Sequence, residues 1–174
     1  MKKEIAYINN LIKNYPRALE QINYPFHSDA EILKLPDGHL GVSVDAVSEE
    51  IGLKLIYHPE TLGWMTVTAS VSDLSAIGLK TQKVSLLLKS SGESKEWEQL
   101  FIKGATEAAA FYQISETEII KATGAETLTA CTAFGFSKNR PSLSRVGLNA
   151  GDALFLTGPI GLGNATALAN ITIR

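Results

Sequence analysis

Four acidic side chains stand at positions where carboxylates could do chemistry. Asp45 ends the polar face of a predicted strand, Asp73 lies in a nearly all-apolar predicted helix, and Asp29 and Glu126 flank other predicted strands. Grouped carboxylates repel one another unless protons or cations intervene, and Mg²⁺ prefers oxygen ligands of this kind, often together with substrate phosphates. Ordinary roles stay open beside this one: Asp29 and Glu126 as solvated loop or cap residues, and Asp73 as a helix-end hydrogen-bond partner.

Two of these acids are brought to one end of a sheet by the predicted elements. Residues 31–35 and 40–47 alternate in the manner of strands, and the Pro-Asp-Gly sequence at 36–38 favours a tight hairpin turn between them. Pairing back from this turn places Asp29 within about one residue of the position opposite Asp45.

Residues 59–78 predict a buried helix, because a proline at the start and a glycine at the end bracket a nearly all-round apolar stretch. Its one polar stripe consists of Thr66, Ser70 and Asp73, which share a face of the helix. The other predicted elements are a helix at 4–14, strands at 84–88, 118–122 and 128–136, and an amphipathic helix at 95–113. The order β-β-α-β-α-β-β predicts an α+β domain, a mixed β-sheet with helices packed on one face.

A second unit is predicted to begin after residue 150, with a strand at 153–157, a glycine loop at 158–163 and a helix from Asn164. One strand and one helix cannot close a core alone. We therefore divide the chain into a domain of residues 1–150 and the start of a truncated second domain at 151–174, with docking on the first domain as the alternative. The glycine loop could cradle a phosphate or form a plain tight turn.

Composition narrows the classes of function. The 174 residues are 45% hydrophobic and 20% charged, and 16 basic against 18 acidic residues give a net charge of -2. This balance speaks against nucleic-acid binding, and no apolar run reaches the roughly 20 residues of a membrane span. The single Cys131 excludes an internal disulfide and is interpreted as core packing, while His27, His39 and His58 are interpreted as surface residues. A cytoplasmic protein is expected.

A series of short motifs extends this interpretation. They are, in chain order, Ser43-Val44-Asp45, Leu62-Gly63-Trp64, Ser70-Val71-Ser72-Asp73-Leu74-Ser75-Ala76-Ile77-Gly78, Gly124-Ala125-Glu126-Thr127, Arg145 with Asn149-Ala150-Gly151-Asp152, and Leu156-Thr157-Gly158. In this order the chain resembles the superfamily of aminoimidazole ribonucleotide (AIR) synthase, selenophosphate synthetase and thiamine-monophosphate kinase, and it most resembles the last. The resemblance implies an AIR-synthase-like N-terminal domain whose sheet pairs into a barrel across a dimer.

The resemblance also implies roles for individual residues. Arg145 matches an arginine that contacts ATP phosphate, and Thr127 belongs with Glu126 to a nucleotide-binding motif. Val44 replaces a threonine of the family pattern and so lacks its oxygen. The family's magnesium ligands fall on Asp29, Ser43, Asp45, Asp73 and Glu126.

The implied function is ATP- and Mg²⁺-dependent phosphotransfer or phosphate activation on a small-molecule phosphate acceptor, by a homodimer without nucleic-acid or membrane partners. The altered motif positions suggest the alternative, a catalytically silent paralogue that acts as a binding or assembly module. A third interpretation is a dinucleotide-binding domain on the glycine loop, which would bind NAD rather than ATP. Because members of the superfamily bind ATP between two domains, residues 1–174 alone are expected to lack turnover.

Overall fold

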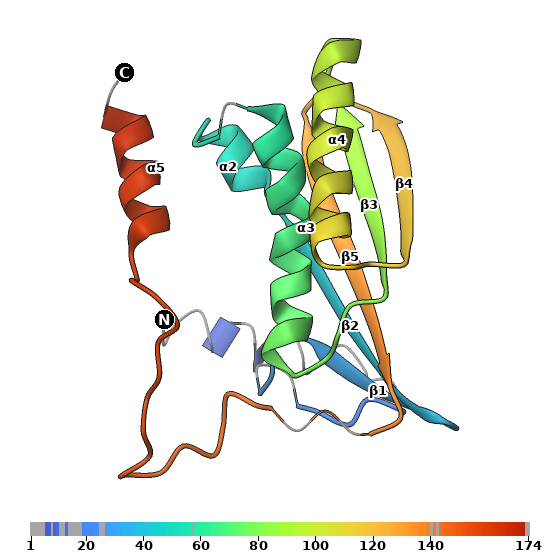
Figure 1. The fold of residues 1–174 in the computed structure, drawn as a ribbon, viewed down its shortest axis with the longest axis vertical. Coiled ribbons are helices and arrows are strands. Elements are labelled where there is room, and N and C mark those ends of the chain that lie inside the picture. The colour runs from blue at the N-terminus through green and yellow to red at the C-terminus, as the bar shows by residue number, and fades with distance from the viewer. Residues whose placement is uncertain are drawn as a thin grey trace.

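The computed structural model describes residues 6–7, 9–10, 13, 19–24, 27–56, 58–139, 141 and 143–172. In Figure 1 helices α3 and α4 lie on one side of a single sheet, and the C-terminal helix α5 stands apart from both. No helix among these residues has both the length and the apolar character needed to cross a membrane. The helix predicted at 4–14 falls largely outside the described residues, as do all four of its apolar positions, Ile5, Ile8, Leu11 and Ile12.

The sheet has five strands in the order β1-β2-β5-β3-β4. All neighbouring strands are antiparallel except β3 and β4, which are parallel and are joined by a helix. The predicted α+β class, with a mixed sheet and helices on one face, is confirmed. The strands are β1 (Glu31–Leu35), β2 (Gly38–Ala46), β3 (Lys83–Ser90), β4 (Glu116–Thr123) and β5 (Leu128–Ser137).

Strands β1 and β2 form the predicted hairpin. Leu35 pairs with Gly38, so that only two residues form the loop, and Glu31 pairs with Val42. Continuing the same register places Asp29 opposite Val44, next to Asp45. The hairpin therefore brings Asp29 to the end of β2 that carries the second acid.

Helix α3 (Pro59–Ala76) packs against β2 and β5 and confirms the helix predicted at 59–78. It ends in a Schellman motif, in which the N–H of Gly78 donates to the carbonyl of Ser75 at 2.9 Å and the N–H of Leu79 donates to the carbonyl of Leu74 at 2.8 Å. Gly78 has a φ of 80°, a conformation that favours glycine. The motif fixes where the helix stops, and with it the position of Asp73 in its last turns.

Helix α4 (Lys95–Phe111) lies beside α3. The Ser94 hydroxyl caps it by accepting a hydrogen bond from the N–H of Trp97 at 3.1 Å. Phe101 and Ala108 of α4 are buried, but Phe111, three residues after Ala108 and so on the same side of the helix, is 69% exposed. Phe111 is the last helical residue and packs only on the surface, with its ring centroid 5.5 Å from that of Trp64. A short helix that the sequence did not predict, α2 (Ser48–Gly52), follows β2.

The sheet has one covered face and one open face. Val84, Leu86 and Leu88 of β3 point toward the helices and are buried. The open face includes the cross-strand pairs Leu40 with Phe136, Val42 with Phe134, and Val44 with Thr132. Val44 is 65% exposed, which leaves an apolar sheet surface on the side away from α3 and α4.

The strand predicted at 153–157 is wrong: residues 152–156 are irregular. Leu154, Phe155 and Leu156 are 81%, 89% and 73% exposed. A strand needs a neighbour for its backbone N–H and C=O groups, and within the described residues this segment has none. Helix α5 (Leu162–Thr172) follows the glycine loop and begins two residues before its predicted start at Asn164.

The two long helices approach each other through glycines. A Cβ atom at Gly63 would lie 2.0 Å from the carbonyl oxygen of Phe101, and one at Gly104 would lie 1.8 Å from the carbonyl oxygen of Glu60. These are backbone atoms that cannot swing aside, so α3 and α4 can cross this closely only without side chains at both positions.

We predict that Gly104→Ala lowers the free energy of unfolding by about 1–3 kcal/mol, because the added methyl group forces the helices apart. Urea denaturation measures this change. Gly52→Ala, at a helical glycine whose Cβ would meet nothing within 4 Å, serves as the control and should leave stability unchanged or slightly raised. Equal unfolding midpoints for Gly104→Ala and the wild type would contradict the close crossing.

Candidate functional site

A polar seam joins α3 to the sheet. The hydroxyl groups of Thr66 and Thr129 lie 3.0 Å apart, and Ser70 Oγ donates to the carbonyl of Cys131 at 2.5 Å. Thr66, Ser70 and Thr129 are fully buried, and each hydroxyl in the seam has a partner. The predicted polar stripe of α3 therefore faces β2 and β5, and it continues to Asp73 at the more open end.

Asp45 and Asp73 meet at this open end. Ser43 Oγ donates to Asp73 Oδ2 at 2.7 Å, and the backbone N–H of Asp45 donates to Ser70 Oγ at 3.2 Å. Burial raises the pKa of Asp45, and the negative charges of Asp73 and Glu50 raise it further. Asp73 also lies near the C-terminus of α3, where the helix dipole disfavours a negative charge. The two carboxylates are thus held together at a cost in stability.

Arg145 ties a second chain segment to this cluster. Its guanidinium forms an ion pair with Asp29, in which Nε lies 3.0 Å from Asp29 Oδ1. The backbone N–H of Arg145 and the hydroxyl of Ser144 both donate to the carbonyl of His27, at 2.8 and 2.7 Å. The hydrogen bond to Asp29 raises the pKa of Arg145, and the charges of Asp29 and Asp73 act in the same direction. Asp29, Asp73 and Arg145 therefore share one electrostatic environment.

Glu126 and Thr127 lie elsewhere, at the start of β5. Thr127 hydrogen-bonds to Glu93 and to Ser91, whose hydroxyl is 2.9 Å away. Partial burial would raise the pKa of Glu93, but the hydrogen bonds from Thr127 and Ser91 outweigh it and hold that pKa below its ordinary value. Glu126 is exposed, and the strand partner of Asp45, Cys131, lies farther along β5. The structure thus links four of the five predicted ligands: Asp29 and Asp73 interact with Arg145, and Ser43 and Asp45 interact with Asp73, whereas Glu126 is exposed at the start of β5.

The gathered side chains suit a hard cation. Within the described ranges no three Asp, Glu, His or Cys side chains converge closely enough to hold a metal ion by themselves. Mg²⁺, however, usually takes one or two carboxylates and fills its other positions with water and substrate phosphate oxygens. Asp45 and Asp73, with the Ser43 hydroxyl beside them, offer that kind of donor set.

Sequence reasoning missed Glu50, which adds a third negative charge near Asp45. It also did not predict that Ser70 accepts a hydrogen bond from the backbone N–H of Asp45. Ser70 was visible as part of the polar stripe, whereas Glu50 depends on the unpredicted helix α2. Cys131 has the predicted structural role: it is 1% exposed, and burial raises its pKa to about 11, so the thiol stays protonated.

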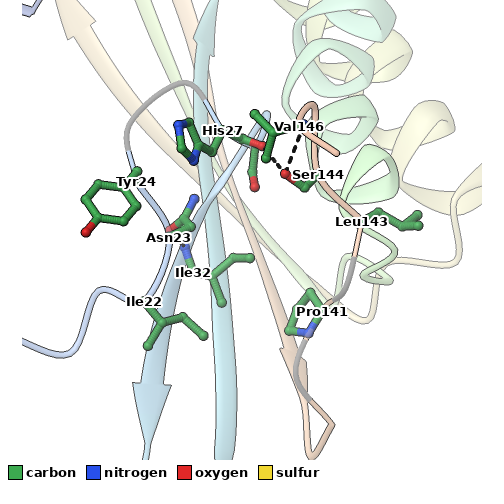
Figure 2. A pocket seen from close by; sticks show the side chains of 10 residues that line it. Ile22, Asn23, Tyr24, His27, Ile32, Pro141, Leu143, Ser144 and Val146 are labelled. Carbon is green, nitrogen blue, oxygen red and sulfur yellow. Dashed lines mark hydrogen bonds between the residues drawn. The ribbon is translucent and has the colours of Figure 1, made fainter. Parts of the chain in front are cut away.

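A pocket of about 570 Å³ adjoins the Arg145–Asp29 ion pair. Figure 2 shows it between two chain segments, one containing Ile22 to Ile32 and the other Pro141 to Val146. Ser28 precedes Asp29 and Ser144 and Val146 flank Arg145 in the chain, so the pocket lies next to the ion pair in sequence, although neither Asp29 nor Arg145 lines it.

The mixed sheet, the helix α3 with its polar seam and the acidic cluster define the class of this domain. The family model described as "AIR synthase related protein, N-terminal domain" matches residues 27–118. The chain belongs to this family, as the motifs predicted.

Known relatives narrow the comparison. A thiamine-monophosphate kinase from Buchnera aphidicola subsp. Acyrthosiphon pisum (strain APS) is 25% identical over 139 residues, which cover 76% of this chain and 41% of that protein. Thiamine monophosphate kinase from Aquifex aeolicus superimposes with a TM-score of 0.57 at 20% identity, covering 79% of this chain and 44% of that one. A structure of AaThiL complexed with AMPPCP and TMP gives 0.57 at 19% identity, covering 78% and 41%. The structural likenesses establish the fold, and the chain spans less than half the length of the curated relatives it matches.

We predict that Asp45→Asn stabilises the folded protein at pH 7. The pKa of Asp45 is raised in the folded state, so the folded protein holds this proton more tightly than the unfolded chain does. The free energy of unfolding therefore falls as the pH rises from the ordinary pKa of 3.8 through the raised pKa. Asparagine does not titrate, so the variant does not lose this free energy. In urea denaturation it should therefore be more stable than the wild type at pH 7, and the difference should shrink toward pH 4.

Asp37→Asn, in the exposed hairpin turn, is the matched control and should show no such difference between the two pH values. An Asp45→Asn variant less stable than the wild type at pH 7 would show that the carboxylate is a net structural support.

Proposed function

We propose that the complete protein is an ATP- and Mg²⁺-dependent phosphotransferase that acts on a small-molecule phosphate acceptor. The observation that carries this proposal is the contact between Asp45 and Asp73, two carboxylates that repel each other in partly buried surroundings. Such an arrangement costs stability unless a cation binds there. The names of the relatives, thiamine-monophosphate kinases, support a kinase in particular.

The side chains divide into cation-binding and phosphate-binding groups. Asp45, Asp73 and the Ser43 hydroxyl would hold Mg²⁺, which when bound neutralises phosphate charge and supplies electrostatic stabilisation to phosphoryl transfer. Arg145 would pair with phosphate oxygens through its planar guanidinium, exchanging a carboxylate partner for a phosphate. The family pattern adds Asp29 and Glu126 as further ligands and Thr127 as a nucleotide contact.

The division of the chain into residues 1–150, an ATP- and Mg²⁺-binding domain, and residues 151–174, the start of a second domain, stays a proposal. It is supported by the exposure of Leu154, Phe155 and Leu156, since three consecutive apolar side chains in water need a partner surface. The second domain would cover these residues and complete the nucleotide site.

A second candidate is a catalytically silent binding or assembly module. The ion pair between Asp29 and Arg145 favours this alternative, because each charge already has a partner within the protein and does not need a cation or a phosphate to neutralise it. The separate position of Glu126 and the loss of an oxygen at Val44 point in the same direction.

We predict that the complete protein binds ATP in a Mg²⁺-dependent manner and that Asp45→Asn and Asp73→Asn each weaken this binding. The expected loss is at least the ~10–100-fold that removal of an outer-shell partner of a metal costs. Isothermal titration with ATP, with and without Mg²⁺, measures it.

Asp37→Asn removes a carboxylate from the exposed turn and should bind like the wild type. Wild-type protein that fails to bind ATP at millimolar concentration would instead establish the silent module, and equal binding by all variants would refute the cation site.

We further propose a homodimer built through the open sheet face. The cross-strand pairs Leu40 with Phe136 and Val42 with Phe134 on β2 and β5 are apolar, whereas α3 and α4 cover only the opposite face. An exposed apolar surface of several strands exceeds what a monomer usually tolerates. A second copy of the same face would cover it, and the N-terminal helix folded across the sheet is the alternative.

Sedimentation velocity at micromolar concentration should therefore give a dimer, and Val44→Asp should convert it to a monomer, because it places a charge in the apolar contact. Leu53→Asp, at a residue that is 51% exposed directly after α2 and outside the strands of the sheet, is the control and should remain dimeric. A monomeric wild type would end this proposal.

A further inference from the structure

The hydroxyl of Ser70 lies at a hydrogen-bonding position of the ladder between β2 and β5. In an antiparallel ladder, pairs of residues that exchange hydrogen bonds alternate with pairs that do not. The N–H of Val47 donates to the carbonyl of Thr129 at 3.2 Å, so these two residues form a bonded pair. Two residues back along β2, Asp45 lies opposite Cys131. The backbone groups of Asp45 and Cys131 therefore also face each other across the ladder.

Ser70 reaches both sides of this ladder position from α3. Its Oγ accepts a hydrogen bond from the N–H of Asp45 at 3.2 Å and donates one to the carbonyl of Cys131 at 2.5 Å. The side chain has no exposed surface, and the single proton of its hydroxyl is already in use. Ser70 therefore supports the backbone of Asp45 rather than meeting a ligand itself.

A second contact joins β2 to α3 close by. Ser43 lies two residues before Asp45 on the same side of the strand, and its hydroxyl donates to Asp73 Oδ2 at 2.7 Å. Asp73 follows Ser70 by three residues and lies on the same face of the helix. The contacts of Ser70 with Asp45 and of Ser43 with Asp73 thus hold the strand and the helix together at two neighbouring points. The separation of the two carboxylates depends on both contacts.

This attachment opposes the repulsion between the carboxylates. Without a cation, the like charges of Asp45 and Asp73 favour a wider spacing. A metal site works best when its ligands are held beforehand within about 0.5 Å of their bound positions. The hydrogen bond from Asp45 to Ser70 exists before a cation arrives, so that binding needs less rearrangement of β2.

We propose that Ser70 is a positioning residue of the cation site, which holds the backbone of Asp45 beside Asp73 so that the two carboxylates can share a cation. The inference rests on the proposed phosphotransfer function and adds to it a residue that touches neither the cation nor the nucleotide. Thr66, about one turn earlier on α3, bonds to Leu62 and Thr129 instead and has no such role.

The test is isothermal titration of the complete protein with ATP, with and without Mg²⁺. Ser70→Ala should weaken the Mg²⁺-dependent binding of ATP about 10–100-fold, the loss typical of groups that support a metal ligand. Binding of ATP without Mg²⁺ should stay as in the wild type. The alanine variant should fold, because the N–H of Asp45 still faces the carbonyl of Cys131 and the two can bond directly.

Thr66→Val is the matched control, because it removes another fully buried hydroxyl of the seam and nearly keeps the shape of the side chain. It should lower the midpoint of urea denaturation, since the hydroxyl of Thr129 loses a partner, and leave the Mg²⁺-dependent binding of ATP unchanged. An equal loss of binding in Thr66→Val would assign the effect of Ser70 to general support of the fold and overturn the inference.

A double-mutant cycle tests whether Ser70 acts through Asp45. In the Asp45→Asn background, Ser70→Ala should cause little further loss of Mg²⁺-dependent binding. Unchanged binding in the single variant Ser70→Ala, or a full second loss in the double variant, would overturn the positioning role alone. A wild type that binds no ATP in the presence of Mg²⁺ would overturn the proposed function together with it.

Discussion

The structure depends on the polar seam where α3 lies across β2 and β5. Helices usually pack on sheets through apolar side chains, but here Thr66 and Ser70 place hydroxyl groups at the centre of the contact, and each finds an oxygen partner. A buried hydroxyl left without a partner costs about 1–3 kcal/mol. Rotation or sliding of α3 would break the hydrogen bond of Ser70 to Cys131 and the contact of Thr66 with Thr129, although Thr66 would keep its bond to Leu62 within the helix, so the seam favours one position of α3. The location of Asp73 relative to β2 follows from that position.

Because the seam holds Asp73 beside Asp45, it also brings two negative charges close together. The positive charge of Arg145 offsets part of the repulsion between the carboxylates. Arg145 belongs to the segment of residues 143–146, which follows all five strands of the sheet in sequence. The charged side chains proposed to bind a cation and a phosphate are therefore the same ones that interact with one another in the folded domain. A ligand that brings its own positive and negative charges can replace these internal contacts without leaving any of them unsatisfied.

Much of this arrangement could be predicted from residue periodicity. The hairpin, α3 and its polar stripe each depend on spacing within one segment, and the register from the turn was enough to place Asp29 near Asp45. Features that depend on distant partners could not be predicted in this way. The segment expected to form a strand at 153–157 has no neighbouring strand among the described residues. Phe111 lies at the end of α4, where no other element of the described chain covers it. The Arg145–Asp29 pair joins residues that are 116 positions apart in sequence. Glu50 was missed because α2 is too short to show a helical period.

Of the five strands of this sheet, β5 is the last in sequence and yet lies at the centre. Until it leaves the ribosome, the hairpin β1-β2 and the unit β3-α4-β4 have no common neighbour, and Thr66 and Ser70 of α3 lack their partners Thr129 and Cys131. Sheets that depend on such distant pairing form slowly, and unpaired strand edges invite wrong partners. The nascent chain thus carries two open half-sheets until residues 128–137 have emerged, and the sheet closes only when β5 pairs with β2 and β3. Protection by a chaperone would matter most during that interval.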